Sequence, residues 1–293
     1  MDSDKTVERM ENFIDTWGMS STLEGPIREP IVEGLFYPDD PNLLKEELIR
    51  LTTSLKDLPG NARAILSPHA SYEKCGMLIA KAFHAAEKRT VDKVILIGPV
   101  HREEEDEILL PESVQFRTPL GCLPVDLEGV EALYSSGTRF IRNDIPHLEE
   151  HCLEVQLPFI HYFFPKAKII PILLGKTSIR TVRLLSHALQ SVFSTEWDHT
   201  LLVISSNASW MTLRDEAERD ASHLLELIQA RDWKSLVEEH AAGRLGACGI
   251  GGIAAVLEMF GSSVTVSTVD RIFVTGENEG KGIVYLSLSF QVA

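Results

Sequence analysis

Two histidines in the first half of the chain each lie just beyond an apolar segment that a proline closes. His69 is three residues past the apolar run 62–66, and His101 is four residues past the run 93–97. Proline cannot donate a hydrogen bond to a β-ladder, so each strand should end there and its histidine should project from a turn. Neutral imidazole is a ligand for zinc, copper and iron. Either histidine alone could instead cap a helix, but two at successive strand ends can converge on one ion.

A further group of candidate residues lies in the segment 146–159. His147 and His151 are spaced i, i+4, as are Glu150 and Glu154, so on a helix each pair would share a face. The order HxxEH is typical of inverted zinc peptidases, in which both histidines bind zinc and the glutamate is the base. The alternative is a helix start in which the glutamates are buried as hydrogen-bonding groups. We favour this alternative, because a peptidase would leave the first two histidines without a role.

A cysteine in a glycine-rich stretch supplies another kind of ligand atom. Cys248 lies within 243–252, where five of the ten residues are glycine. This density of glycine indicates a tight backbone, close to a bulky group or to a helix N-terminus. A thiolate there would be stabilised by the helix dipole and by a metal ion, whereas a neutral thiol would be a small buried side chain in a packed turn. The stretch contains neither GxGxxG nor a Walker lysine, which argues against a nucleotide loop.

The composition excludes several classes of protein. The 293 residues are 44% hydrophobic and 24% charged, which is typical of a globular chain. Acidic residues outnumber basic ones 43 to 28, and the net charge of −15 argues against a nucleic-acid partner. No apolar run reaches the ~18 residues of a spanning helix, which argues against membrane insertion. Four cysteines without a CxxC pair, and a polar N-terminus, indicate a cytoplasmic protein.

The elements that must position these residues alternate along the chain. Short apolar runs predict strands, and amphipathic stretches between them predict helices. The expected strands are 62–66, 93–97, 168–174 and 200–204, and the expected helices are 75–86, 148–162, 179–193 and 214–228. This order predicts an α/β fold with a mainly parallel central sheet flanked by helices, to which 263–272 and 282–290 add an antiparallel pair. We expect one domain over 25–293, preceded by an N-terminal helical appendage over 1–24. Ligands of such sheets lie at the carboxyl ends of the strands, where Asn207 also falls.

Six motifs occur in one order along the chain. They are Gly34-Leu35-Phe36-Tyr37-Pro38, Pro68-His69-Ala70-Ser71-Tyr72, Gly98-Pro99-Val100-His101, Thr118-Pro119-Leu120-Gly121 with Val125-Asp126, Glu150-His151-Cys152-Leu153-Glu154-Val155-Gln156-Leu157-Pro158-Phe159, and Ala247-Cys248-Gly249. Together they resemble the Memo-like family, whose fold is similar to that of the class III extradiol ring-cleaving dioxygenases. The resemblance covers nearly the whole chain from about Glu33, with Ser71 where the family has glycine. It is specific for the fold and less so for the activity.

The resemblance implies a metal site made of His69, His101 and Cys248. The ring-cleaving relatives use Fe(II) with a carboxylate as the third ligand, whereas a thiolate favours copper or zinc and still admits iron. We therefore expect iron or copper, with zinc as the alternative, and a small-molecule or peptide ligand in the pocket. The resemblance also implies a radical-SAM protein as a candidate partner.

The chain departs from the family at one place in the pocket. After the fourth strand the family has aspartate and histidine, where this sequence has Asn207 and Trp210. Neither can transfer a proton. We expect His151, Glu154, Asn207 and Trp210 to be the catalytic residues of the pocket, with Trp210 as a cap. Glu150, His151 and Glu154 would orient the metal ligands. The main hypothesis is a metal-dependent, non-haem oxidoreductase with altered or reduced chemistry; the alternatives are a non-catalytic ligand- or protein-binding scaffold and a zinc hydrolase built on the histidines of 146–159.

Overall fold

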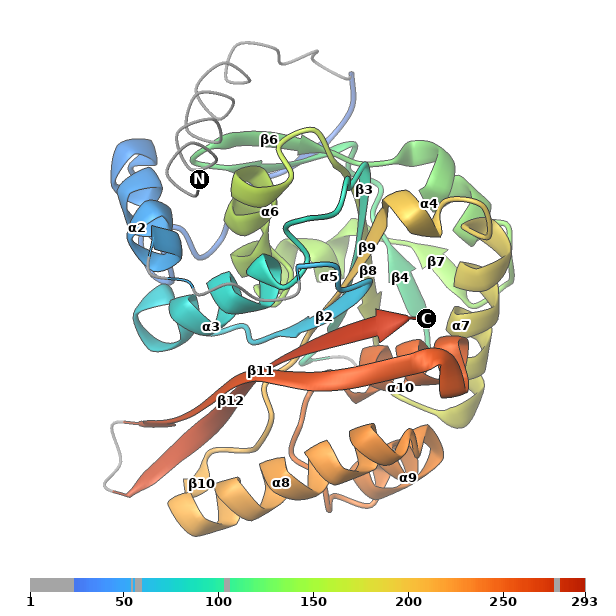
Figure 1. Ribbon diagram of the computed structural model, residues 1–293. Helices are drawn as coiled ribbons and strands as arrows, with labels where there is room; N and C mark the ends of the chain where they lie inside the picture. The colour runs from blue at the N-terminus through green and yellow to red at the C-terminus, as the bar shows by residue number, and fades with distance from the viewer. Residues whose placement is uncertain (1–23, 54, 56–59, 103–105, 277–279, 293) are drawn as a thin grey trace.

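A mixed β-sheet runs through the centre of the molecule, between two layers of helices (Figure 1). The computed structural model describes residues 24–53, 55, 60–102, 106–276 and 280–292. The proposed appendage over 1–24 lies outside these residues except for its last position. Among the described residues, no helix combines the length and the apolar character needed to cross a bilayer.

The centre of the sheet consists of four parallel strands in the order β2, β9, β3 and β8. Their bounds are Ala64–Ser67, Thr200–Ser205, Lys93–Pro99 and Lys168–Leu174. Nearly every residue in them is buried, as expected for strands covered by helices on both faces. The four strands predicted from apolar runs are therefore confirmed, and their carboxyl ends meet at one edge of the sheet.

Antiparallel pairs complete the sheet on both sides. The predicted C-terminal pair is confirmed: β11 (Val264–Thr275) pairs with β12 (Lys281–Val292), which also pairs with β2 and with β10 (Thr212–Leu213). On the other side β4 (Ile108–Leu110) runs antiparallel to β8 and parallel to β7 (Phe140–Arg142). The prediction of a mainly parallel sheet thus holds for the central strands and for the pair β4–β7, while the other edge pairings are antiparallel. A second small sheet, which the sequence analysis did not predict, joins β1 (Ile27–Arg28), β5 (Gln115–Thr118) and β6 (Gly121–Pro124).

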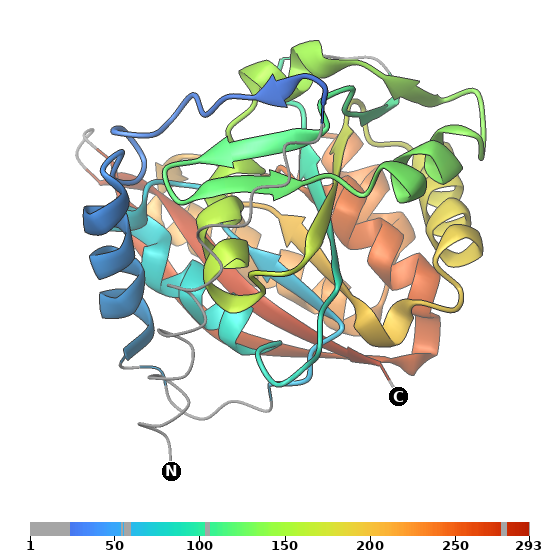
Figure 2. The ribbon, with the colours of Figure 1, turned by 90° about the horizontal axis from the view of Figure 1, so that it is seen from above.

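Helices cover the two faces of the sheet in separate groups, as Figure 2 shows from above. One group is α2 (Pro41–Thr53), α3 (Tyr72–His84) and α6 (Leu157–Phe163). The other is α4 (Leu127–Tyr134), α7 (Ile179–Val192), α8 (Arg214–Ala230), α9 (Trp233–Ala241) and α10 (Ile250–Phe260). Three of the four predicted helices, α3, α7 and α8, lie where their apolar periodicity placed them.

The predicted helix over 148–162 is wrong, because the chain breaks into three pieces there. Helix α5 (Asp144–Glu149) ends before Glu150, a single 3₁₀ turn spans Glu154–Gln156, and α6 follows. Glu150 has an extended backbone, with φ −96° and ψ 135°. The cause is tertiary: Glu150 and Glu154 are buried, and their carboxylates bond to groups far away in the chain. Buried carboxylates need such partners, and this need overrides the local helical pattern.

The segment after the break is anchored by a buried ion pair between Arg28 and Glu154. Both side chains are at most 1% exposed. The guanidinium also donates to the carbonyl oxygens of His147 and Glu150, each at 2.9 Å. The carboxylate accepts from the backbone of residues 31 and 32 and, at 2.8 Å, from the hydroxyl of Tyr37. Glu154 is therefore an anchor for this segment, as expected for a buried hydrogen-bonding glutamate, and its expected role in the pocket stays a prediction.

Replacing Arg28 with alanine should lower the free energy of unfolding by about 3–5 kcal/mol, because Glu154 would keep a buried charge without its cation. Urea denaturation would measure the change. Arg50→Ala is the matched control, since Arg50 is 63% exposed and pairs with Glu47 on one helix surface, so it should move the unfolding midpoint little. Similar midpoints for the two variants would contradict the anchoring role of Arg28.

Candidate metal centre

His69 follows the end of β2 by two residues, and its ring forms a hydrogen bond with Ser205. The Nδ1 atom lies 2.8 Å from the hydroxyl of Ser205, which donates its own proton to the carbonyl of Cys152 at 2.7 Å. A serine hydroxyl has one proton, so Ser205 must accept from the Nδ1–H of His69. Nε2 is then the atom that faces the site. The His69 side chain is buried, and its tautomer is set by the end of β9.

His101 follows the end of β3 by two residues, and it is held by Glu150. One carboxylate oxygen accepts from the His101 backbone N–H at 2.6 Å, and the other lies 2.8 Å from Nδ1. Two hydrogen bonds raise the pKa of His101 to about 10: the bond to Cys248 has the larger effect and the bond to Glu150 the next. Burial acts in the opposite direction. Burial also acts to raise the pKa of Glu150, but the hydrogen bonds from His101 outweigh it and lower that pKa. Glu150 thus directs Nε2 of His101 toward the site.

Cys248 comes from the loop between α9 and α10 rather than from a strand end. Its sulfur lies 3.3 Å from Nε2 of His69 and accepts from the backbone N–H of Asn207 at 3.2 Å. Burial acts to raise the pKa of the thiol, but His69, His101 and the Asn207 N–H together hold it well below its ordinary value. A low thiol pKa favours the thiolate, which is the form that binds metals.

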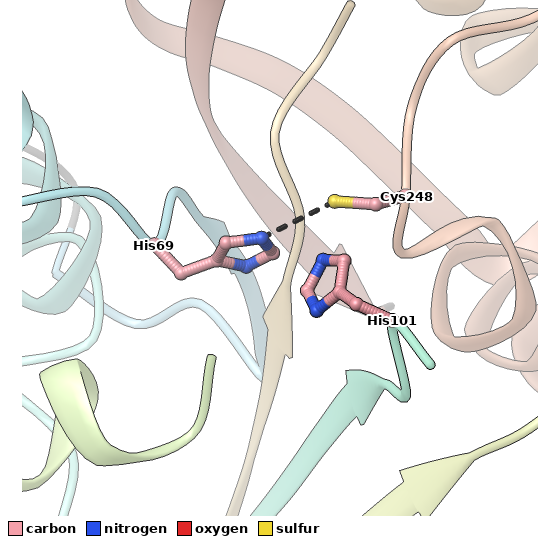
Figure 3. A group of neighbouring side chains, drawn as sticks. All are labelled: His69, His101 and Cys248. Carbon is pink, nitrogen blue, oxygen red and sulfur yellow. Dashed lines mark hydrogen bonds between the residues drawn. The ribbon is translucent and has the colours of Figure 1, made fainter. Parts of the chain in front are cut away.

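The donor atoms of His69, His101 and Cys248 converge on one point (Figure 3). All three atoms lie within 4.8 Å of one another. Two ligands at the usual nitrogen and sulfur bond lengths around one tetrahedral ion would lie about 3.6 Å apart, close to the 3.3 Å between His69 and Cys248. An ion bound by imidazole lies near the ring plane, and the two rings cross at 81°, so their planes intersect. The residues therefore fit one transition-metal ion.

His101, Glu150 and His151 form a second group of nearby donor atoms. The rings of His101 and His151 are stacked, with 13° between their planes and 5.6 Å between their centroids. Both oxygens of Glu150 already bond His101, one to its backbone N–H and one at its ring nitrogen. In this arrangement Glu150 positions His101, and His151 stands beside the candidate ion site without being one of its three ligands.

His147 lies away from this centre, which removes the basis for the zinc hydrolase alternative. It lies within α5, whereas His151 follows the helix end, so the two do not share a helix face. His147 is 2% exposed, and its Nε2 atom lies 3.3 Å from the carbonyl of Leu109. Burial, as the largest effect, lowers the pKa of His147 to about 4.

Asn207 and Trp210 lie on the loop after β9, and Asn207 contacts two of the three donor residues, His69 and Cys248. Its side-chain oxygen accepts from the backbone N–H of His69 at 3.1 Å, while its own N–H reaches Cys248. Trp210 is 54% exposed and borders a surface pocket of about 350 Å³ beside α8. Its described contacts are with Asp220 of α8 and with the loop 242–249 that carries Cys248 (the cysteine loop), where its ring crowds Gly246.

The comparisons with known proteins agree with this architecture. The family model described as Memo-like protein matches residues 28–269. A MEMO1 family protein of Thermotoga neapolitana is 30% identical over 253 residues, which cover 82% of this chain and 91% of that protein. A second, from Nitrosopumilus maritimus, is 29% identical and covers 79% of this chain and 86% of its own length.

The chain belongs to the Memo-like family. A crystal structure of an uncharacterized protein, JW3007 from Escherichia coli K12, shares the fold with a TM-score of 0.51 at 11% identity, covering 77% of this chain and 98% of that one. The family explains the order of the motifs, but the residues that orient the ligands follow from the structure. In this Memo-like protein Ser205 and its acceptor carbonyl set the His69 tautomer, and the sequence analysis missed both. The serine pair that ends β9 was the only available signal.

Replacing Glu150 with glutamine should lower the pKa of His101 by about 1–2 pH units, because the ring loses a charged hydrogen-bond acceptor. Nuclear magnetic resonance titration of the histidine side chains in metal-free protein would measure this. Glu149→Gln is the control, since Glu149 is the adjacent, exposed residue and should leave the His101 titration unchanged. An unchanged His101 titration in Glu150→Gln would contradict the assigned role of Glu150.

Proposed function

We propose that this Memo-like protein binds one transition-metal ion through His69, His101 and Cys248 and is a metal-dependent oxidoreductase with limited capacity for proton transfer. The observation that carries the proposal is the convergence of three donor atoms from three separate parts of the chain. The Nδ1 atom of each histidine is bonded, to Ser205 or to Glu150, so both Nε2 atoms face Cys248 and the ion site. Such outer partners are typical of metal-binding histidines.

The thiolate in the donor set determines which ions we expect. Sulfur ligands favour copper and zinc, and two imidazoles with one further ligand also suit iron. A bound iron or copper ion would supply one-electron chemistry and open positions for a small ligand, whereas zinc would supply only a Lewis acid. We favour iron or copper, as the similarity of the fold family to ring-cleaving dioxygenases implies.

His151 is the side chain best placed to accept a proton from a ligand in this site. Its ring centroid lies 5.7 Å from that of His69 and 5.6 Å from that of His101. Burial first, and then the charges of the two ligand histidines, lower the pKa of His151 to about 4. The ring is therefore neutral at pH 7 and can accept a proton, but it is a weak base. Because Asn207 and Trp210 cannot transfer protons, this weak base limits the chemistry we propose.

The second candidate function is a scaffold that binds a ligand without turnover. Its support is that the amide of Asn207 is occupied in holding the His69 backbone, and that Trp210 contacts the cysteine loop. The two candidates differ in whether an ion is needed, so metal analysis separates them.

Tag-free protein should contain about one iron or copper ion per chain, and His69→Ala/His101→Ala should lose at least ~90% of it, since one thiolate alone holds an ion weakly. Inductively coupled plasma mass spectrometry would measure this. The matched control is His187→Ala/His199→Ala, which removes two exposed histidines and should keep the metal.

Three outcomes would contradict parts of the proposal. An unchanged metal content in His69→Ala/His101→Ala would show that the site is assigned wrongly. Zinc as the resident ion would remove the redox function while keeping the site. No binding of Fe(II), copper or zinc after anaerobic reconstitution would favour the scaffold.

Metal affinity should rise with pH between about 6 and 9. The sulfur of Cys248 and Nε2 of His69 are 3.3 Å apart, and His101 holds its proton up to a pKa of about 10, so the ion must displace at least one proton. Each proton released raises the affinity about tenfold per pH unit below the pKa of the group that holds it. Isothermal titration calorimetry in buffers of different ionisation enthalpy would count the protons released on binding, with His69→Ala/His101→Ala as the control. A binding enthalpy that is the same in every buffer would contradict this expectation.

A further inference from the structure

Cys248 differs from the two histidines in how the fold supports it. His69 and His101 follow directly from buried strands, whereas Cys248 lies in an irregular loop between α9 and α10. A loop of this kind holds a ligand accurately only if neighbouring elements fix its backbone. Two described contacts do so close to the sulfur: the backbone N–H of Gly249 donates to the hydroxyl of Ser206 at 2.9 Å, and that of Asn207 reaches the sulfur.

A third contact comes from α8, which packs against the other end of the loop. The carboxylate of Asp220 accepts from the backbone N–H of Gly246, at 3.0 Å from one oxygen and 3.3 Å from the other. The same carboxylate accepts a hydrogen bond from the backbone N–H of Trp210. One half-buried side chain thus joins the cysteine loop to the loop after β9.

The two loops are in such close contact that Gly246 has no room for a side chain. A Cβ atom there would lie 2.4 Å from the backbone nitrogen of Trp210 and 2.5 Å from the Asp220 carboxylate. It would also lie 2.8 Å from the indole of Trp210, which therefore covers the loop. Contacts below 3.0 Å would force the loops apart, so the glycine is required for the approach.

We propose that Asp220 is a positioning residue for Cys248: by joining Gly246 to Trp210, it holds the cysteine loop where the sulfur meets His69 and His101. This inference rests on the proposed metal site and adds a residue to it from a helix that supplies no ligand. Trp210 is the residue to which Asp220 joins Gly246, which explains why an exposed tryptophan lies beside the centre without entering it.

Cobalt(II) is the probe for the test, because a thiolate bound to it gives an intense sulfur-to-metal charge-transfer absorption. Wild type should bind one Co(II) with this band, and Asp220→Ala should bind it at least about tenfold more weakly and with less absorption per bound ion. Asp220→Asn keeps one acceptor oxygen and should recover part of both. Asp215→Ala, at an exposed acid of the same helix, should match wild type.

Gly246→Ala gives an independent variant, in which Asp220 is intact but the new Cβ separates the loops. It should reduce the charge-transfer band as Asp220→Ala does, and circular dichroism with thermal unfolding identifies any variant that fails to fold. Wild-type affinity and absorption in folded Asp220→Ala or Gly246→Ala would overturn the role of Asp220 while leaving the metal site in place. Wild type that binds no Co(II), or binds it without the thiolate band, would instead overturn the proposed function and this inference with it.

Discussion

The buried carboxylate of Glu154 is the constraint on which the site depends. A charge this deep is stable only beside its cation and with its oxygens bonded, and Arg28 with the backbone at 31 and 32 meets this need. These partners come from the last residue of β1 and from the residues just after it, more than a hundred residues away in the chain. By holding Glu154, they keep the segment 150–156 from forming an α-helix and hold it along the carboxyl ends of the central strands.

That segment reaches both ligand histidines. At its start, Glu150 bonds the ring and the backbone of His101. Two residues on, the carbonyl of Cys152 accepts a hydrogen bond from the Ser205 hydroxyl, so the serine oxygen is left as an acceptor for His69. A helix over the same residues would have used this carbonyl within its own ladder, and Glu150 would not have reached His101. The helix break is therefore what gives each imidazole a fixed tautomer.

The third ligand is supported in another way. Cys248 receives hydrogen bonds from the backbone at Asn207, and its loop is joined to the loop after β9 through Ser206 and Asp220. Where the family has an aspartate and a histidine, this chain has an amide that bonds backbone groups and an indole that covers a glycine. Both replacements are suited to holding a thiolate in place and unsuited to moving protons. Both features fit the proposed metal site, in which we assign proton transfer to the weak base His151.

The sequence by itself determined the central strands, three of the main helices and the sheet edge at which His69, His101 and Asn207 lie. These features depend on local apolar periodicity and on prolines that end strands, and both are visible in a short window of residues. The family resemblance, also a property of the sequence, named Cys248 as the third ligand. The mixed edges of the sheet, the small sheet and the broken helix over 148–162 were decided by the tertiary structure. For the broken helix the cause is a long-range pairing of polar groups, because Glu150 and Glu154 bond partners far away in the chain. Such pairings overcome local propensity because an unsatisfied buried polar group costs more free energy than a broken helical turn.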